Sequence, residues 1–463
     1  MRVGVVGAGA AGLTAAYELV KRGHTAVVYE RAPFMGGQAS TFDVGGAQLE
    51  RGYHHLFVSD VDIIELVREV GLGHRLSYVE SSVGTLFDGK IYDFVTPLDL
   101  LRFTPLSLVD RLRLGLVTLR LQRMKDWRAL EGVTAAEWLR KNAGRGPYEV
   151  FWGPMLRGKF GEEYHTQVGM AWVWGKIHTR FASRGKGMAR EVLVYPTGSF
   201  GEVFDTVAEK IVEQGGQVHP STAVTGIDVK DGRVAGLVVE PSPATWTSPE
   251  PLRAGPDAAT PPAPAGGDAV FEPFDAVIAT TPSHTFARLL PSLPADYRAR
   301  LTGVNYMAAV LIVLDLDRPL SRIYWLNVAD RSVPFVGVIE HTNLIGPENY
   351  GGKHLVYLSN YLPTDHPLYG LDHQALLDEY LPHLRKINPE FDPSWIQQSY
   401  HHRVDAAQPI IGVEYSSRIP DHRTPVPGVY LANTTQVYPE DRGTNYSVRI
   451  GKRVAHMVMD DLS

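Results

Sequence analysis

Three glycines near the start of the chain have the spacing that a phosphate-binding turn requires. They follow an apolar strand expected at 3–6, and they are Gly7, Gly9 and Gly12. The first glycine of such a turn allows a tight change of direction, the second lets a pyrophosphate approach the backbone, and the third lets a helix pack closely on the sheet. The helix that follows, through Ala10 and Ala11, offers free N–H groups and a partial positive charge. The chemistry expected here is binding of a nucleotide pyrophosphate.

An acidic residue completes this unit. Glu30 ends a second apolar strand, 18 residues after Gly12, and its carboxylate is expected to accept hydrogen bonds from ribose hydroxyls. A carboxylate at this place disfavours a 2′-phosphate, so NADP is not expected. Strand, helix, strand and acid in this order predict a βαβ dinucleotide-binding unit. The alternative is a glycine-rich turn that binds no ligand.

A second pair of glycines follows the acid. Gly36 and Gly37 come six and seven residues after Glu30, and Gln38 is next. This arrangement resembles the second signature of the amine oxidase, protoporphyrinogen oxidase and phytoene desaturase superfamily of FAD-dependent enzymes. The resemblance implies that FAD is the cofactor and that the glycine pair passes beneath its pyrophosphate. The residue after the pair is often arginine in that superfamily, so here Arg31 is expected to compensate partly for Gln38.

The same resemblance implies a fold. It is an α/β fold with a Rossmann-like FAD-binding domain of the glutathione-reductase type, assembled from discontinuous segments. We place this domain at 1–85, 196–285 and 421–463. A substrate domain of mixed sheet and helices (α+β) is then expected at 86–195 and 286–420.

Two later stretches also match the superfamily. Val224 lies on a strand whose backbone is implied to contact the adenine, and Asn433 stands where an aspartate is usual. The last helix is implied to begin at the N1–C2=O edge of the flavin, where reduction places negative charge that a helix N-terminus stabilises. The residues expected at this helix N-terminus are Gly443, Thr444 and Asn445.

Candidate catalytic residues lie in a histidine pair and beside the last helix. His54 and His55 resemble the His-rich loop of UDP-galactopyranose mutases, which are relatives of the superfamily. Neighbouring side chains of an extended segment alternate, so at most one of them should face the flavin, where a neutral imidazole can relay a proton. Simple packing is the alternative. Arg442 is the best candidate for an anion contact, Tyr446 is a further candidate, and no metal site is expected.

The segment 151–180 alternates aromatic residues with cations such as Lys159 and Lys176. This pattern suits a pocket for a planar or anionic small molecule, although a helical core with a basic face is the alternative. The strand expected at 305–312 lacks the lysine that monoamine oxidase relatives place near flavin N5. Oxidation of amines is therefore the less favoured chemistry.

Composition narrows the class of protein. The chain has 463 residues, a net charge of −6 and no cysteine, so we expect several domains, no nucleic-acid partner and no disulfide. No run reaches the roughly 18 apolar residues that span a bilayer, and the chain is interpreted as cytoplasmic. The segment 97–127 interleaves leucines with basic residues, which is typical of a helix on a membrane surface, with a solvated basic face as the alternative. Residues 241–268, with 8 prolines in 28 positions, predict a mobile surface insertion.

The leading hypothesis is an FAD-dependent oxidoreductase that accepts a hydride from a C–H or C–N bond of a small, lipophilic or anionic substrate. A redox-neutral flavoprotein mutase acting on a sugar nucleotide is the main alternative, because of the histidine loop. A non-catalytic lipid-binding scaffold is a remote alternative, since such proteins lack the intact glycines.

Overall fold

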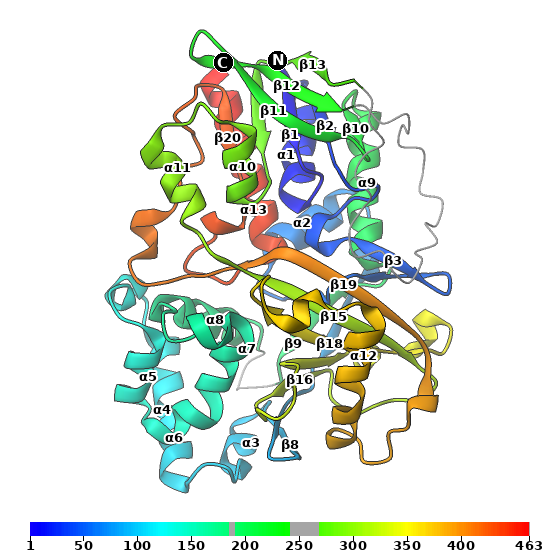
Figure 1. Ribbon diagram of the computed structural model, residues 1–463, viewed down its shortest axis with the longest axis vertical. Coiled ribbons are helices and arrows are strands. Elements are labelled where there is room, and N and C mark those ends of the chain that lie inside the picture. The colour runs from blue at the N-terminus through cyan, green and yellow to red at the C-terminus, as the bar shows by residue number, and fades with distance from the viewer. Residues whose placement is uncertain (185–189, 241–267, 463) are drawn as a thin grey trace.

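The computed structural model describes residues 1–184, 190–240 and 268–462. Figure 1 shows the N- and C-termini at the same end of the molecule, over a parallel sheet. The longest strands, β15 and β19, cross the middle, and the helices from α3 to α8 gather at the opposite end. The predicted α/β architecture is therefore observed.

The parallel sheet has five short strands, and all-parallel sheets are typically covered on both faces. Each hydrogen-bonded pair in it is parallel. In spatial order its strands are β10 (Gln217–His219), β2 (Thr25–Tyr29), β1 (Arg2–Val6), β14 (Ala276–Ala279) and β20 (Val429–Leu431). Strands therefore come from all three segments predicted for the FAD-binding domain, while the exact boundaries stay a prediction.

Helix α1 (Ala10–Val20) is buried along its whole length between this sheet and its helical neighbours. It packs on α9 (Ser199–Glu213) and α13 (Thr444–Leu462), and α13 also contacts α2 (Val61–Glu69). Small residues allow the close approach of α13. A Cβ atom added at Gly451 would lie 2.4 Å from the backbone oxygen of Ala11.

The molecule has two lobes, and the parallel sheet lies in the first. An antiparallel sheet covers this first lobe. It contains β11 (Ala223–Lys230), β12 (Arg233–Glu240) and β13 (Val270–Pro273). The sequence indicates strands on both sides of the predicted insertion, and β12 does pair with β13. The insertion itself, at 241–268, lies outside the described residues except for Asp268. Two further helices of this lobe are α10 (Ser283–Leu289) and α11 (Ala295–Thr302).

The second lobe contains a seven-stranded mixed sheet. Only β16 and β7 pair in parallel, and the other pairs are antiparallel. In spatial order the strands are β19 (Ile396–Pro409), β15 (Tyr306–Leu316), β18 (His354–Leu362), β17 (Gly337–Glu340), β16 (Trp325–Val328), β7 (Val83–Phe87) and β8 (Lys90–Asp93). Helix α12 (His373–Tyr380) contacts β15.

Short strands join the two lobes. One hairpin and one three-stranded sheet contain β3 (Thr41–Val44), β4 (Ala47–Glu50), β5 (Leu56–Phe57), β6 (Leu76–Glu80) and β9 (Val192–Pro196). The segment between β4 and β5 carries the predicted histidine pair. Pairing of β5 with β9 holds that segment at the boundary of the lobes.

The helical part of the second lobe has its own apolar core. Its helices are α3 (Pro97–Arg102), α4 (Leu108–Arg123), α5 (Ala135–Asn142), α6 (Arg145–Pro147), α7 (Gly153–Tyr164) and α8 (Met170–Ala182). The segment 97–127 is therefore two helices and not one. Pro105 disfavours helix at the residue before it, and the side chains of Thr96 and Ser107 each cap a new helix.

Candidate functional site

The first glycine turn leaves a surface without side chains at the start of α1. Gly7 has φ +104°, a value that favours glycine. A Cβ at Gly12 would lie 1.9 Å from the oxygen of Gly7, and one at Gly37 would lie 3.1 Å from the Cα of Gly9. Gly9 caps α1 without any side-chain hydrogen bond. The first N–H groups of the helix, including those of Ala10 and Ala11, thus lack intrahelical partners, which fits a bound pyrophosphate.

The first glycine turn and the second glycine loop, at Gly36 and Gly37, together form what we call the glycine cradle. Glu30 joins these two loops. Its carboxylate accepts hydrogen bonds from the N–H groups of Ala8 (2.9 Å) and Ala32 (2.8 Å). Burial raises the pKa of Glu30. Each carboxylate oxygen keeps a second lone pair for a ribose hydroxyl. The N–H of Thr222 donates to the backbone oxygen of Glu30 at 2.8 Å, so Val224, at the start of β11, lies close to the same acid.

The second glycine loop continues the cradle toward the cavity. Gly36 pairs with Gly9 in a parallel bridge. The Gln38 side chain donates from Nε2 to the oxygen of Ala406 at 3.0 Å and lines the cavity described below. Arg31 is exposed, and its role in compensating for Gln38 stays a prediction.

The N-terminus of α13 lies beyond the cradle. Because Gly451 touches α1 at Ala11, Thr444 is seven residues further along, about 10 Å at 1.5 Å per residue. That separation suits the span between a pyrophosphate and the ring system attached to it. Gly443 and Thr444 line the cavity at this point.

Two predicted amide side chains bind protein groups. Asn445 accepts a hydrogen bond from the N–H of Ile63 in α2 at 3.2 Å. Asn433 donates from Nδ2 to the oxygen of Thr281 at 2.9 Å and accepts from the Thr435 hydroxyl at 2.7 Å. These hydrogen bonds therefore hold α13 and the segment after β20 in place, and the backbone N–H of Asn433 also donates to Gln436 Oε1 at 2.9 Å.

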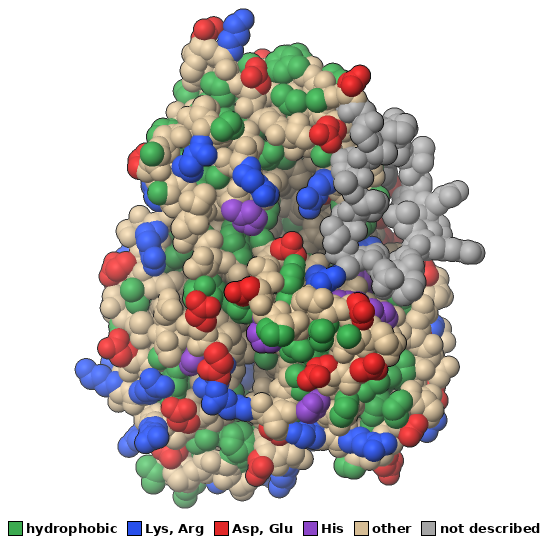
Figure 2. Space-filling model, in the orientation of Figure 1, with side chains coloured by type: hydrophobic (Ala, Val, Ile, Leu, Met, Phe, Trp, Pro, Cys, Tyr) green, Lys and Arg blue, Asp and Glu red, His purple; other side chains and the backbone are tan. Residues whose placement is uncertain are grey.

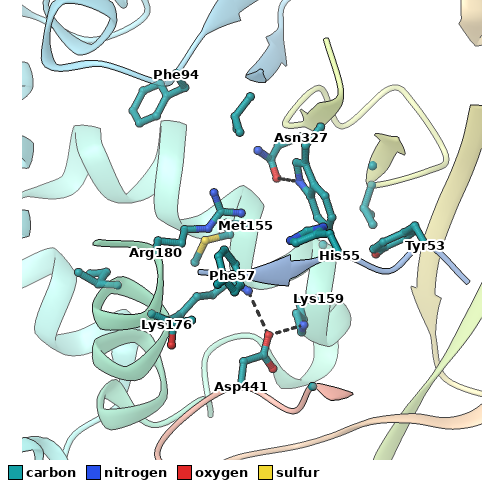
Figure 3. Close-up of a pocket in the computed structure, with 18 of the residues that line it drawn as sticks. Tyr53, His55, Phe57, Phe94, Met155, Lys159, Lys176, Arg180, Asn327 and Asp441 are labelled. Carbon is teal, nitrogen blue, oxygen red and sulfur yellow. Dashed lines mark hydrogen bonds and ion pairs between the residues drawn. The ribbon is translucent and has the colours of Figure 1, made fainter. Parts of the chain in front are cut away.

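A cavity of about 510 Å³ opens from this place into the second lobe. Figure 3 shows side chains from both lobes around it, including Tyr53, His55, Asp441 and Phe94. One end is lined by Gln38, the histidine pair and the residues before α13. The other end reaches α3 and α4. The chain therefore joins the cradle to a space that can hold a ring system and a substrate.

Both histidines of the predicted pair line this cavity, but their rings engage different groups. His54 Nδ1 lies 2.6 Å from the oxygen of Gly52, and His55 Nδ1 lies 2.9 Å from the hydroxyl of Tyr324. Burial lowers the pKa of His54 to about 4 and that of His55 to about 3. Both imidazoles are thus neutral at pH 7.

Arg442 and Tyr446 also line the cavity. Arg442 donates to Gln408 Oε1 at 3.2 Å and to the Tyr361 hydroxyl at 3.1 Å. Burial opposes ionisation of Tyr361, but the positive charges of Arg442 and Lys159, together with the hydrogen bond to Tyr53, outweigh it and lower the pKa of this phenol. The Tyr446 hydroxyl lies 3.4 Å from that of Thr179, and burial raises the pKa of Tyr446 to about 12.

A three-residue ion cluster lies beside Arg442. Asp441 Oδ2 accepts from Lys159 Nζ at 2.7 Å and from Lys176 Nζ at 3.0 Å, while its Oδ1 accepts from Trp172 at 3.3 Å. Burial alone would raise the pKa of Asp441, but the two lysines lower it strongly. Burial also lowers the pKa of Lys176 to about 8. The sequence indicated both lysines, but no local signal linked them to Asp441.

Sequence reasoning also missed a buried carboxylate at the lobe boundary. Glu50 accepts hydrogen bonds from the Tyr195 hydroxyl and the N–H of Phe200, both at 2.8 Å. Its backbone oxygen accepts from the Tyr357 hydroxyl at 2.6 Å. Burial raises the pKa of Glu50 to about 7. This carboxylate fixes the end of β4, and thereby the start of the histidine segment that follows.

Within residues 1–184, 190–240 and 268–462, no three or more histidine or acidic side chains gather as a metal site would require. No helix in those ranges combines the length and apolarity needed to cross a bilayer.

Known proteins resemble this chain in fold and in sequence. A putative protoporphyrinogen oxidase from Exiguobacterium sp. superposes with a TM-score of 0.73 at 18% identity, covering 100% of this chain and 98% of its own. Reduced UDP-galactopyranose mutase gives 0.73 at 15% identity, with 100% and 96% covered. A probable zeta-carotene desaturase from Synechococcus elongatus is 31% identical over 185 residues. That match spans 34% of this chain and 37% of the relative's length.

A family model described as flavin-containing amine oxidoreductase matches residues 10–456. This is nearly the whole chain, and it includes the second glycine loop, the histidine pair and the start of α13. The protein therefore belongs to the flavin-containing amine oxidoreductase family, which confirms the predicted family, the fold class and FAD as the cofactor.

Proposed function

We propose that this protein is an FAD-dependent oxidoreductase that takes a hydride from a C–H or C–N bond of a small organic substrate. The observation that carries the proposal is the continuity of the glycine cradle with the cavity. Gly9 and Gly37 lie against each other without side chains, so a pyrophosphate can approach both backbones. About 10 Å further along α13 the cavity begins. When bound, FAD supplies the hydride acceptor.

The residues around the cavity have separate roles in this proposal. The N-terminus of α13 and Arg442 stabilise negative charge at the flavin-facing end. His55 engages Tyr324 through Nδ1, so its other ring nitrogen is the atom that exchanges a proton. Strand β15 carries no lysine, which disfavours an amine as the substrate. The relative named as a desaturase supports a C–H bond as the site of oxidation.

We also propose the domain division and membrane contact that the sequence suggests. FAD binds to 1–85, 196–285 and 421–463, and the substrate binds mainly to the remaining segments. The outer end of the cavity lies under α3 and α4. Six of their exposed side chains are apolar, at 43–68% exposure, and they are Leu98, Leu101, Leu108, Val109, Leu112 and Leu116. Figure 2 shows hydrophobic and basic side chains together at this lower tip. Such a surface suits lipophilic substrates taken from a membrane.

The test is the colour and redox behaviour of the purified protein. We expect a yellow protein with one FAD per chain that bleaches when an oxidisable substrate is added without oxygen. A colourless protein that cannot be reconstituted with FAD contradicts the proposal. A nicotinamide cofactor in place of the flavin contradicts it equally.

The mutase alternative makes a different prediction about electrons. A mutase needs reduced flavin but consumes no electron acceptor during turnover. Stoichiometric consumption of an acceptor with substrate therefore supports the oxidoreductase. The apolar outer wall, formed by side chains such as Leu100, Leu114 and Phe151, offers few hydrogen-bond partners to a sugar.

A further inference from the structure

The cavity carries excess positive charge in a chain whose net charge is −6. Five of its described lining residues are cationic, and two are acidic. The cations are Lys159, Lys176, Arg180, Arg184 and Arg442, and the acids are Asp60 and Asp441. A cleft lined by one sign of charge concentrates ligands of the opposite sign. Neutral histidines do not change this balance.

The two lysines keep hydrogen-bonding capacity to spare. An ammonium group has three N–H donors. Within the described residues, Asp441 is the hydrogen-bond partner that each lysine has. The side chains of Lys159 and Lys176 are 17% and 26% exposed, and this exposure is toward the cavity that they line. One carboxylate thus leaves the pair with a net positive charge and free donors.

Arg180 extends this cationic surface along α8. It follows Lys176 by one helical turn, so both lie on the same face. Its nearest carboxylate oxygen, on Glu191, is 3.5 Å away, a long contact for an ion pair of this type. Figure 3 shows Arg180 reaching into the cavity between Phe94 and the lysine cluster.

Apolar side chains occupy the space beyond the cations. Met155 precedes Lys159 by one turn of α7, about 6 Å along the helix axis. Phe94 stacks on Phe151 with ring centroids 4.5 Å apart, and both line the cavity. Figure 3 places Met155 between Phe94 and Asp441. The cavity therefore has a cationic inner end and an apolar outer end.

We propose that the substrate has an apolar body and one anionic oxygen group, a carboxylate or a phosphate, that docks on Lys159, Lys176 and Arg180. The inference rests on the proposed function, because it names the class of molecule that enters the same cavity. A pure hydrocarbon or a neutral alcohol leaves these cations desolvated without compensation, which costs binding energy. Arg442, two residues before α13, is left for the flavin.

Isothermal titration calorimetry of the full-length protein tests this class directly. The probes are decanoate, decyl phosphate and decanol, which share one apolar chain. We expect at least one of the anions to bind about tenfold or more tightly than decanol, as charge-assisted hydrogen bonds imply. The stronger anion identifies the recognised group. Equal affinity for decanol, or no detectable binding of either anion, overturns the proposal.

Variants locate the anion within the cavity. The double variant Lys159→Met/Lys176→Met should lose the preference for the anion while it still binds decanol. The matched control, Lys210→Met/Lys230→Met, removes two lysines outside the cavity lining and should keep the preference. An unchanged preference in the first variant overturns the assignment. If that variant does not fold, the comparison of decanoate, decyl phosphate and decanol on the unmodified protein still shows whether an anion is preferred.

Visible absorption, recorded on the same samples, separates this inference from the proposed function. A yellow protein that prefers decanol contradicts the anion site alone. A colourless protein that cannot take up FAD contradicts the proposed function. Calorimetry on that protein still measures whether the anion is preferred.

Discussion

The cradle and the inner end of the cavity are neighbouring parts of one site, but they are built in different ways. The cradle consists of backbone from two short glycine loops within the first 38 residues. The inner end consists of charged side chains from segments far apart, since Asp441 is 282 residues from Lys159. The cradle thus depends on space that side chains would fill, and the inner end depends on a balance of charge.

Filling the space in the cradle should give the largest effect on function, because the bound FAD is lost. In Gly12→Ala the new Cβ would lie 1.9 Å from the oxygen of Gly7, so α1 must move away from the sheet. We expect loss of most of the bound FAD and a decrease of about 1–3 kcal/mol in the free energy of unfolding. The ratio of visible to ultraviolet absorbance reports the first effect, and urea denaturation reports the second.

Gly370→Ala is the matched control for this change. Gly370 is exposed, and a Cβ there meets no atom within 4 Å. FAD content and stability should be unchanged. Full FAD occupancy in Gly12→Ala would show that close packing of α1 is not what forms the cradle.

Removing charge from the inner end should come next. Asp441→Asn leaves Lys159 and Lys176 close together without their shared carboxylate. Breaking a buried ion pair on one side costs about 3–5 kcal/mol, and we expect the lower end of this range because the cluster borders a cavity. Urea unfolding followed by circular dichroism measures it. Asp317→Asn, which removes an exposed partner of Arg318, should leave the midpoint unchanged, and similar midpoints for both variants would contradict the account.

The pH dependence of anion binding distinguishes charge from shape. Burial lowers the pKa of Lys176 to about 8, so its positive charge is present below that pH and is lost as the pH rises through it. The affinity for decanoate should fall about tenfold between pH 7 and 9, since one pH unit above the pKa corresponds to tenfold. Lys176→Arg keeps its charge over this range and should show a flat profile. Calorimetry at both pH values decides, and a flat profile in the unmodified protein would count against the cationic site.

The smallest effect is expected where the cradle gains a charge. Gln38→Arg restores the cation that relatives of the superfamily often have after the glycine pair. Gln38 contributes one hydrogen bond, to the oxygen of Ala406, so its replacement costs little. We expect FAD to dissociate only a few-fold more slowly, since a partly exposed charge adds about 1 kcal/mol or less. Dilution followed by flavin fluorescence measures the rate, and a change of more than about a hundredfold would mean that the cradle depends on charge after all.

The two regions also differ in how well the sequence predicts them. The glycine turns, the acid at Glu30 and the strands around them are local patterns, and the structure places them as expected. The lysine pair was visible as part of a basic aromatic segment, but its meeting with Asp441 depends on how α7, α8 and the approach to α13 pack. Such long-range contacts leave no local signature. Asn433 and Asn445 are the opposite case. Their local sequence pattern predicted residues at a cofactor, but their side chains form hydrogen bonds with protein groups.

The division of 97–127 into two helices has a local cause that the leucine pattern obscured. Thr96 and Ser107 are good N-cap residues, and Pro105 lies between them. The periodicity of leucine and arginine suggested one continuous face. Phe103, at the break, is fully buried, so the interruption anchors the pair of helices to the core.

A crystal structure of the purified yellow protein tests the central claim most directly. We expect FAD with its pyrophosphate over Gly9 and Gly37 and its ring system between the His54–His55 segment and the N-terminus of α13. The cationic surface of Lys159 and Lys176 should then face the substrate side of the ring. A flavin bound elsewhere, or side chains filling the space beside Gly9 and Thr444, would contradict it.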